Sequence, residues 1–234
     1  MAKRGGSHHS KRLTVPNAVP VIGRKTIRWM LTPHPGAHPK ERAITLGSLL
    51  RDNLKFGVDL REVKKAIKTG SVKIDGKVSK DERRAVGLMD IVDIPKVGKQ
   101  WRIQVGANGK LMAKEISADL ARMKLAKVVG KTTIRGGKTQ IALHDGRSLM
   151  ADNAVQVGST LMMSVPAFKI EKSLPLQAGA RCLITSGKHA GETATLEQII
   201  ERVGSMGSEA SLKSGNESFI TVTRYLFVVD TEFA

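Results

Sequence analysis

Turn-forming residue pairs that end in glycine recur between residues 75 and 146, and short runs of β-branched or apolar residues flank them. The pairs are Asp75-Gly76, Asn108-Gly109, Gly136-Gly137 and Asp145-Gly146. Such pairs supply the positive φ angles of tight hairpin turns, and alternating residues on both sides mark the paired strands. The sequence therefore predicts a chain rich in antiparallel β-structure.

Residues 130–139 contain the tripeptide Gly-Lys-Thr twice, and this tripeptide ends the phosphate-binding loop of many ATPases and GTPases. Such a loop needs another glycine five positions before the Gly of the tripeptide. Leu125 and Thr132 stand at the two corresponding positions. The β-branched residues and the Gly136-Gly137 pair predict a basic β-hairpin instead, and this excludes the nucleotide-hydrolysing class.

Positive charge is the feature that bears most directly on function. The 234 residues carry a net charge of +18, with +8 in residues 1–42, +5 in 43–100, +7 in 101–176 and −2 in 177–234. This points to a polyanion, and nucleic acid is favoured over anionic membrane because no amphipathic helix with an aromatic-rich apolar face is visible. Since aromatic residues are only 3% of the chain, we expect recognition of phosphates and of folded or duplex shape rather than base stacking.

Several other classes of protein are disfavoured. The single cysteine, Cys182, cannot form an internal disulfide, which fits a reducing cytoplasm, and its apolar surroundings predict a buried side chain rather than a nucleophile. His34 and His38 have the spacing of a zinc-binding helix, but Pro33 and Pro35 exclude that helix, so we expect loop histidines and no metal. We expect no secretory signal and no membrane span, because the charged N-terminus lacks a following apolar region and no apolar run is long enough.

Residues 1–42 are predicted to form an extended basic arm. Prolines and glycines interrupt this segment and exclude a long helix, and Trp29 is its single large anchor. The segment is too poor in apolar residues to order itself. We expect either a disordered tail or a segment that becomes ordered on a partner.

Residues 43–97 are predicted to contain two helices and a hairpin. Leucines at helical spacing mark a first helix that ends near Gly57, and a second helix has Asp59 as its N-cap, Glu62 in a capping box and Gly70 as its stop. A hairpin turns at Asp75-Gly76, and a turn and a strand follow at residues 87–94. The second helix has an apolar side, which consists of Leu60, Val63, Ala66 and Ile67. Its basic side consists of Arg61, Lys64, Lys65 and Lys68.

This segment resembles the S4-type RNA-binding domain in residues 63–67, Gly70, 72–78 and 87–92. That domain grips RNA with its second helix and its hairpin. The resemblance implies that the four basic residues of the helix bind phosphates, together with Lys73 and Lys77 on the hairpin strands.

Residues 98–173 are predicted to be β-rich, with strands at 101–105, 128–134, 139–143 and 160–165 and a short helix near 117–125. Lys127, Lys131, Arg135 and Lys138 cluster at the Gly136-Gly137 hairpin. This hairpin either touches RNA or is a solvated turn, and the sequence leaves both possibilities open.

Residues 174–234 resemble the KOW motif of small, SH3-like β-barrels, on the pattern of strand, Gly187, Gly191 and strand. Ala194 stands where the motif has another glycine, and the resemblance implies RNA contacts by Lys188 and His189. We expect a mobile loop at 204–215 and closing strands at 216–223 and 225–229.

The order of these parts, with the segments at 9–16, 72–78 and 87–94 and the motifs Leu-His-Asp-Gly-Arg and Asn-Glu-Ser-Phe-Ile-Thr, resembles the ribosomal protein S4e family of archaea and eukaryotes. The compact length indicates an archaeal member. The resemblance implies an α+β multidomain protein, with an arm (1–42), an S4-type domain (43–97), a β-rich central domain (98–173) and a KOW-type barrel (174–234).

The same resemblance implies a cytoplasmic, ribosome-bound structural constituent of the small subunit that binds 16S rRNA and neighbouring ribosomal proteins, without catalysis or cofactors. S4-type domains also occur on pseudouridine synthases and tyrosyl-tRNA synthetases, but neither catalytic signature is visible. An RNA chaperone or transcription-associated RNA-binding factor is the alternative. The residues expected to bind RNA are Lys3, Arg4, Lys11, Arg12, Arg24, Lys25, Arg28, Arg61, Lys64, Lys65, Lys68, Lys73, Lys77, Lys131, Arg135, Lys138, Lys188 and His189.

Overall fold

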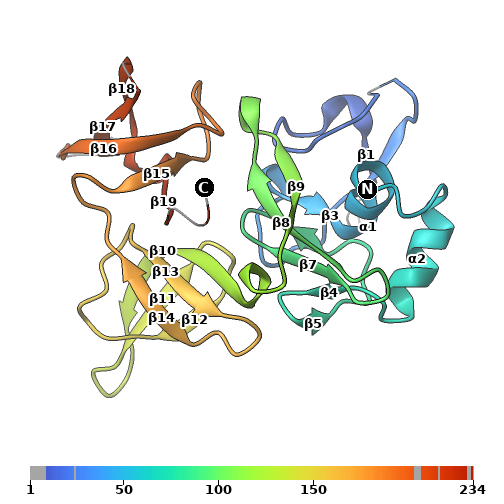
Figure 1. Ribbon diagram of the computed structural model, residues 1–234, viewed down its shortest axis with the longest axis horizontal. Coiled ribbons are helices and arrows are strands. Elements are labelled where there is room, and N and C mark those ends of the chain that lie inside the picture. The colour runs from blue at the N-terminus through green and yellow to red at the C-terminus, as the bar shows by residue number, and fades with distance from the viewer. Residues whose placement is uncertain (1–8, 24, 203–206, 216, 231–232, 234) are drawn as a thin grey trace, which may run out of the picture. The chain divides into compact units, whose positions relative to one another are not determined.

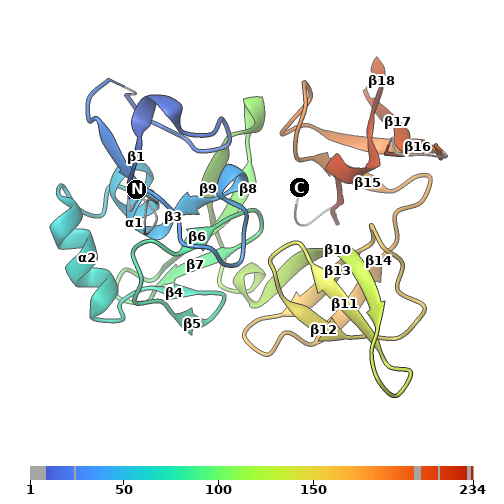
Figure 2. The same ribbon diagram turned by 180° about the vertical axis from the view of Figure 1, so that it is seen from behind.

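The computed structural model describes residues 9–23, 25–202, 207–215, 217–230 and 233. The chain divides into two compact units, one of residues 1–104 and 110–121 and the other of residues 105–109 and 122–234 (Figures 1 and 2). Among the described residues, none of the helices has the length and apolar character that a membrane crossing requires.

A five-stranded sheet with the strand order β5-β4-β7-β8-β9 forms the framework of the first unit. Its strands are β4 (Lys73–Ile74), β5 (Lys77–Val78), β7 (Ile91–Ile94), β8 (Lys99–Val105) and β9 (Leu111–Ile116). β7 and β8 form an antiparallel hairpin, and Trp101 and Ile103 of β8 are buried. The domain boundary expected between residues 97 and 98 therefore cuts this sheet, because residues 95–98 form a tight turn rather than a linker.

Both expected helices of the first unit are present. The first is a short helix, α1 (Leu46–Ser48), that continues into a π-helical turn at Leu49–Asn53, and the second is α2 (Leu60–Lys68). Val63 and Ile67 are buried on the inner face of α2, but Ala66 is exposed, so its place in the apolar face was predicted wrongly. A helix of this length buries a narrow stripe, and Ala66 lies at its margin.

The caps of α2 follow the prediction in part. Asp59 occupies the N-cap position, but its carboxylate accepts no capping hydrogen bond. Glu62 instead accepts a hydrogen bond from the backbone N–H of Val58 at 3.1 Å. Gly70, with a φ of +78°, ends the helix as expected.

The described part of the N-terminal segment, from residue 9 on, packs on its own chain, contrary to the prediction that the segment could not order itself. β1 (His9–Lys11) pairs antiparallel with β2 (Trp29–Leu31), and Val19 and Met30 are buried. Between β1 and β2, turns hold the described residues, with hydrogen bonds from Val19 N–H to the Pro16 oxygen and from Thr26 N–H to the Gly23 oxygen. β3 (Ile44–Thr45) then pairs with β6 (Ala85–Val86). The few apolar residues of this segment suffice to order it because the rest of the first unit supplies the remaining core.

The second unit contains two five-stranded sheets, and the first has the order β12-β11-β10-β13-β14. Its strands are β10 (Met123–Thr133), β11 (Thr139–Leu143), β12 (Ser148–Met150), β13 (Thr160–Ser164) and β14 (Ile170–Leu174). The expected helix at 117–125 is wrong apart from one 3₁₀ turn at Leu120–Arg122. β10 begins at Met123, because residues 123–127 pair with β13.

The C-terminal sheet has the order β18-β17-β16-β15-β19. Its strands are β15 (Arg181–Ile184), β16 (Thr193–Ile200), β17 (Glu209–Ser214), β18 (Glu217–Val222) and β19 (Leu226–Val228). The loop expected at 204–215 is wrong for residues 209–214, since β17 pairs with both β16 and β18. Residues 204–206 of that prediction lie outside the described residues.

Candidate nucleic-acid interface

The basic side of α2 is an exposed surface of the first unit. Arg61, Lys64, Lys65 and Lys68 line a shallow hollow together with Thr69. Their spacing along one helix places them on one stripe, while the buried Val63 and Ile67 fix which stripe faces outward. We call Arg61, Lys64, Lys65 and Lys68 the α2 basic surface.

One of the four cations differs from the others. The Lys64 ammonium lies 2.9 Å from Glu82 Oε1, in an ion pair that joins α2 to the segment before β6. Although partial burial opposes ionisation of Glu82, the hydrogen bond from Lys64 holds the pKa of this carboxyl below its ordinary value. Within the described part of the chain, no acidic side chain pairs with Arg61, Lys65 or Lys68. These three cations are therefore the ones available to an anion.

The β4–β5 hairpin adjoins the end of this helix. A side chain added to Gly70 would lie 3.2 Å from Val78 of β5. Asp75 and Gly76 have φ angles of +49° and +75°, which confirms the predicted turn. The Asp75 carboxylate is buried and accepts a hydrogen bond from the N–H of Ile91 at 3.1 Å, so it points away from the solvent.

The two hairpin lysines keep the positions expected for them. Lys73 lies opposite Val78 and Lys77 opposite Ile74 in the ladder. Lys77 is exposed and Lys73 is half-buried.

Of the RNA contacts expected in the N-terminal segment, three are side chains on its surface and one is buried. Lys11, Lys25 and Arg28 are exposed. Arg12 is buried, and its guanidinium lies 3.1 Å from Asp52 Oδ2, so it is part of the core rather than of a basic surface. The sequence could not reveal this pair, because its two members are far apart in the chain. The other residues expected to bind RNA here, Lys3, Arg4 and Arg24, lie outside the described residues.

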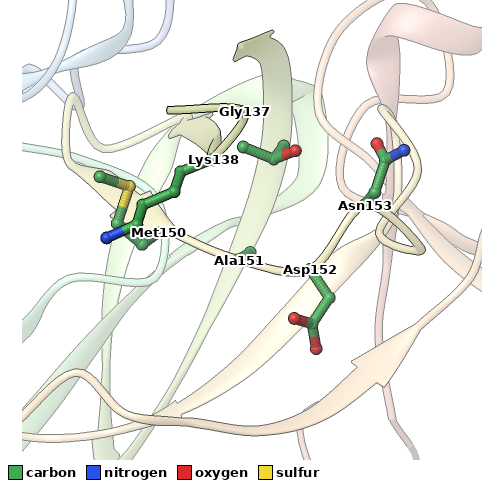
Figure 3. A pocket seen from close by; sticks show the side chains of 7 residues that line it. Gly137, Lys138, Met150, Ala151, Asp152 and Asn153 are labelled. Carbon is green, nitrogen blue, oxygen red and sulfur yellow. The ribbon is translucent and has the colours of Figure 1, made fainter. Parts of the chain in front are cut away.

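The β10–β11 hairpin presents some of its cations and uses others internally. Arg135 and Lys138 are exposed at its tip. Lys131 donates hydrogen bonds to the backbone oxygens of Asn153 and Val155, and so holds the loop after β12. Lys138 lines an open hollow with Asp152, and Figure 3 shows its side chain extending toward Met150.

Lys127 has a structural task. Its ammonium donates hydrogen bonds to the backbone oxygens of Thr223, Arg224 and Leu226, at 3.3, 3.0 and 2.6 Å. These bonds hold the segment that leads into β19. The charge of Lys127 is therefore directed at the protein's own backbone.

In the loop between β15 and β16, Gly187 and Gly191 have φ angles of +101° and +94°, as a tight loop requires. Lys188 is exposed. His189 stacks on Phe219, with ring centroids 4.1 Å apart, and lies 3.1 Å from Glu192. Of the two contacts expected here, Lys188 is the more accessible.

The chain matches known proteins over almost its whole length. The family model described as ribosomal family S4e matches residues 97–170. The small ribosomal subunit protein eS4 of Methanosphaera stadtmanae is 36% identical over 229 residues, which are 98% of this chain and 95% of the relative. The eS4 protein of Methanocaldococcus jannaschii is 36% identical over 242 residues, which are 99% of this chain and 98% of the relative. The chain belongs to the ribosomal protein S4e family.

A solved S4e structure has the same fold. The crystal structure of the 30S ribosomal protein S4e from Thermoplasma acidophilum matches with a TM-score of 0.72 and 32% identity, covering 83% of this chain and 99% of that chain. The family identified from the sequence is thereby confirmed, and its archaeal relatives are ribosomal proteins rather than enzymes. The S4e model matches β8 to β13 and leaves out α2, so the basic surface of that helix rests on its own geometry.

Sequence reasoning missed a buried charge cluster in this S4e chain. Lys124 Nζ lies 3.2 Å from Asp145 Oδ2, and both side chains are buried. Arg147 also lies 3.2 Å from this carboxylate, with its guanidinium 3.7 Å from the centre of the Phe168 ring. The Asp145-Gly146 turn was predicted correctly, but the partner across the sheet left no local signal.

Other side chains with possible chemistry are also structural. Cys182 is fully buried, and burial raises the pKa of its thiol to about 11, which makes it a poor nucleophile. His38 is buried beside Asp90, with Nε2 2.9 Å from Oδ2. In the described residues, no group of three or more His, Cys, Asp or Glu side chains is arranged to hold a metal ion.

Proposed function

We propose that this S4e chain is a structural constituent of the small ribosomal subunit that binds 16S rRNA through exposed Lys and Arg side chains, in the cytoplasm and beside other small-subunit proteins. Its relatives are named small ribosomal subunit proteins, which supports the assignment to that subunit. The observation that carries the mode of binding is the α2 basic surface. On one face of a rigid element it presents three cations that pair with no carboxylate of the described residues.

Electrostatics favours phosphate as the ligand of this surface. Lys and Arg that contact phosphates release the counterions condensed on RNA, and this release drives binding without base recognition. Arg61, Lys65 and Lys68 lie on a helix whose inner face is packed, so little backbone conformational freedom is lost on binding. Lys73 and Lys77 extend the same positive charge onto the adjoining hairpin.

We further propose that the two ends of the chain act as the S4-type and KOW-type modules that they resemble. Residues 46–94 supply two helices and a hairpin to the first module, and the glycine loop between β15 and β16 supplies Lys188 to the second. The remaining phosphate contacts proposed are Lys11, Lys25, Arg28, Arg135 and Lys138. Lys64, Lys131 and His189 have partners within the protein and contribute less.

Co-sedimentation tests the ribosomal assignment. The tagged chain, expressed in its own host, is expected to be recovered with small subunits in a one-to-one ratio after a moderate-salt wash. Recovery only in free or transcription-associated fractions would contradict the assignment and favour the RNA-chaperone alternative.

A matched pair of triple variants tests the surface itself. Arg61→Ala/Lys65→Ala/Lys68→Ala removes the three available cations and no buried side chain, so we expect a folded protein that competes poorly with the natural chain for assembly. The control, Lys99→Ala/Lys172→Ala/Arg202→Ala, removes the same formal charge from cations already paired with Glu115, Asp230 and Glu209. Equal incorporation of the two variants would exclude a special role for α2.

A further inference from the structure

The outer face of the β1–β2 ribbon exposes a tryptophan. His9, Lys11 and Trp29 are exposed, whereas Ser10 and Met30 are more buried, and Lys11 lies directly opposite Trp29 in the register. Met30 is 5% exposed, whereas its neighbour Trp29 is 42% exposed. The other tryptophan of the chain, Trp101, is 6% exposed. Trp29 is therefore exposed because of its position on the ribbon, and not because the tryptophans of this chain are exposed in general.

Planar and cationic groups surround this indole. The Arg28 guanidinium carbon lies 4.9 Å from the centre of the Trp29 ring. The His9 ring lies 4.6 Å away, at 73° to the indole plane. Two neighbours thus fix the orientation of the indole while leaving much of its surface in solvent.

The exposed charged residues that lie close to Trp29 in this segment are all cations. Lys11 and Arg28 flank it, and Lys25 is exposed three residues before Arg28. Residues 1–42 contain a single acid, Glu41. The nearby Asp52 is committed to the buried ion pair with Arg12. The sequence of this segment therefore offers little negative charge to neutralise the cations of the ribbon face.

This combination matches an unpaired nucleotide better than duplex RNA. An exposed aromatic ring stacks on a base only when the base is free of its helix, and adjacent cations then hold the flanking phosphates. Within a duplex, away from its ends, the base faces are covered and the indole would gain nothing. A protein partner that docked on the ribbon would have to supply carboxylates for its cations.

We propose that Trp29 stacks on an unpaired base of RNA, with Lys11, Lys25 and Arg28 binding the adjacent phosphates. The inference rests on the proposed function and adds to it a preference for single-stranded or looped RNA at this face. It also modifies the expectation from composition, because one well-placed indole suffices for local stacking even in a chain with few aromatic residues.

Fluorescence gives a direct test, because the chain has only two tryptophans. In the full-length Trp101→Phe variant, Trp29 is the sole indole, and phenylalanine retains a ring beside Phe56. A short oligo(A) RNA is expected to quench Trp29 emission strongly on binding. A blunt RNA duplex with the same number of phosphates is expected to bind, as followed by anisotropy of an end label, with little quenching.

Affinity measurements in the natural background do not depend on the Trp101 variant. Trp29→Leu keeps apolar bulk but removes the aromatic face, and we expect it to bind oligo(A) about 5-fold or more weakly, as the loss of one stacked base predicts. Trp29→Phe should retain most of the affinity. Duplex binding should be unchanged in both.

The outcomes separate this inference from the proposed function. Unquenched Trp29 emission, or equal oligo(A) affinity of Trp29→Leu and the natural chain, with duplex binding intact, would overturn the stacking proposal alone. Failure of the natural chain to bind either RNA would overturn the proposed function as well.

Discussion

At the scale of single residues, the basic side chains fall into two groups that composition does not separate. Lys124 and Arg12 are buried in ion pairs with Asp145 and Asp52, and Lys127 is bonded to backbone oxygens. Arg61, Lys65 and Lys68, by contrast, are exposed on α2. The partners of the first group lie on other elements, so only the folded chain distinguishes a structural cation from one that can bind RNA.

The buried pair at Asp145 makes a prediction about stability and pH. Asp145→Asn should leave the Lys124 ammonium buried without its counter-charge, and the free energy of unfolding should fall by about 3–5 kcal/mol at neutral pH. The exposed pair of Lys99 and Glu115 provides the control, since Glu115→Gln should cost about 0–1 kcal/mol. Denaturant unfolding followed by circular dichroism measures both, and equal effects would contradict the assigned role of the buried pair.

The pH dependence of the same pair has a definite sign. Burial opposes ionisation of Asp145, but the charges of Lys124 and Arg147 prevail and hold its pKa below the ordinary value. The resulting stabilisation is therefore fully present above about pH 3.9, the unfolded pKa, and is lost as the pH falls through the lower folded pKa. Asp145→Asn should weaken this acid-induced loss, and an unchanged pH profile would exclude Asp145 as its source.

At the scale of elements, the sequence was informative where structure is set locally. The Asp75-Gly76 hairpin and α2 were predicted because turn residues and helical spacing lie within a few positions of each other. β17 was missed because its residues are mostly small or polar, which is typical of a loop, and the strand is held by neighbours on both sides that lie elsewhere in the chain. The order of residues 9–42 was missed because it depends on a core supplied by later residues.

The Gly136-Gly137 turn of the β10–β11 hairpin is predicted to require a residue with a positive φ at position 137. Gly137 has a φ of +70° and no atom within 4 Å of an added Cβ, so Gly137→Ala should be destabilising by about 1–2 kcal/mol through backbone strain alone. Gly36 has equal space and no positive φ, so Gly36→Ala should be neutral or slightly stabilising. Denaturant unfolding measures the difference, and equal values would show that the hairpin does not require a left-handed residue.

At the scale of the whole molecule, net charge alone does not specify where RNA binds. The chain carries +18 in total, yet residues 177–234 contribute −2, and several exposed cations elsewhere are neutralised by nearby carboxylates. Long-range attraction depends on the total charge, whereas phosphate binding depends on available side chains in fixed positions. The two contributions separate in the salt dependence of binding.

The salt dependence of RNA affinity reports how many cations contact phosphates. Removal of one cation that binds a phosphate should lower the slope of log K against log salt by about 0.7–0.9, so Arg61→Ala/Lys65→Ala/Lys68→Ala should reduce it by about 2 to 3 on 16S rRNA fragments. The control Lys99→Ala/Lys172→Ala/Arg202→Ala has the same net charge but removes cations already paired with carboxylates, so its slope should change little. Filter binding over a range of salt concentrations measures both slopes. If the two slopes fell equally, net charge rather than the α2 basic surface would govern binding, because only a local site distinguishes the two variants.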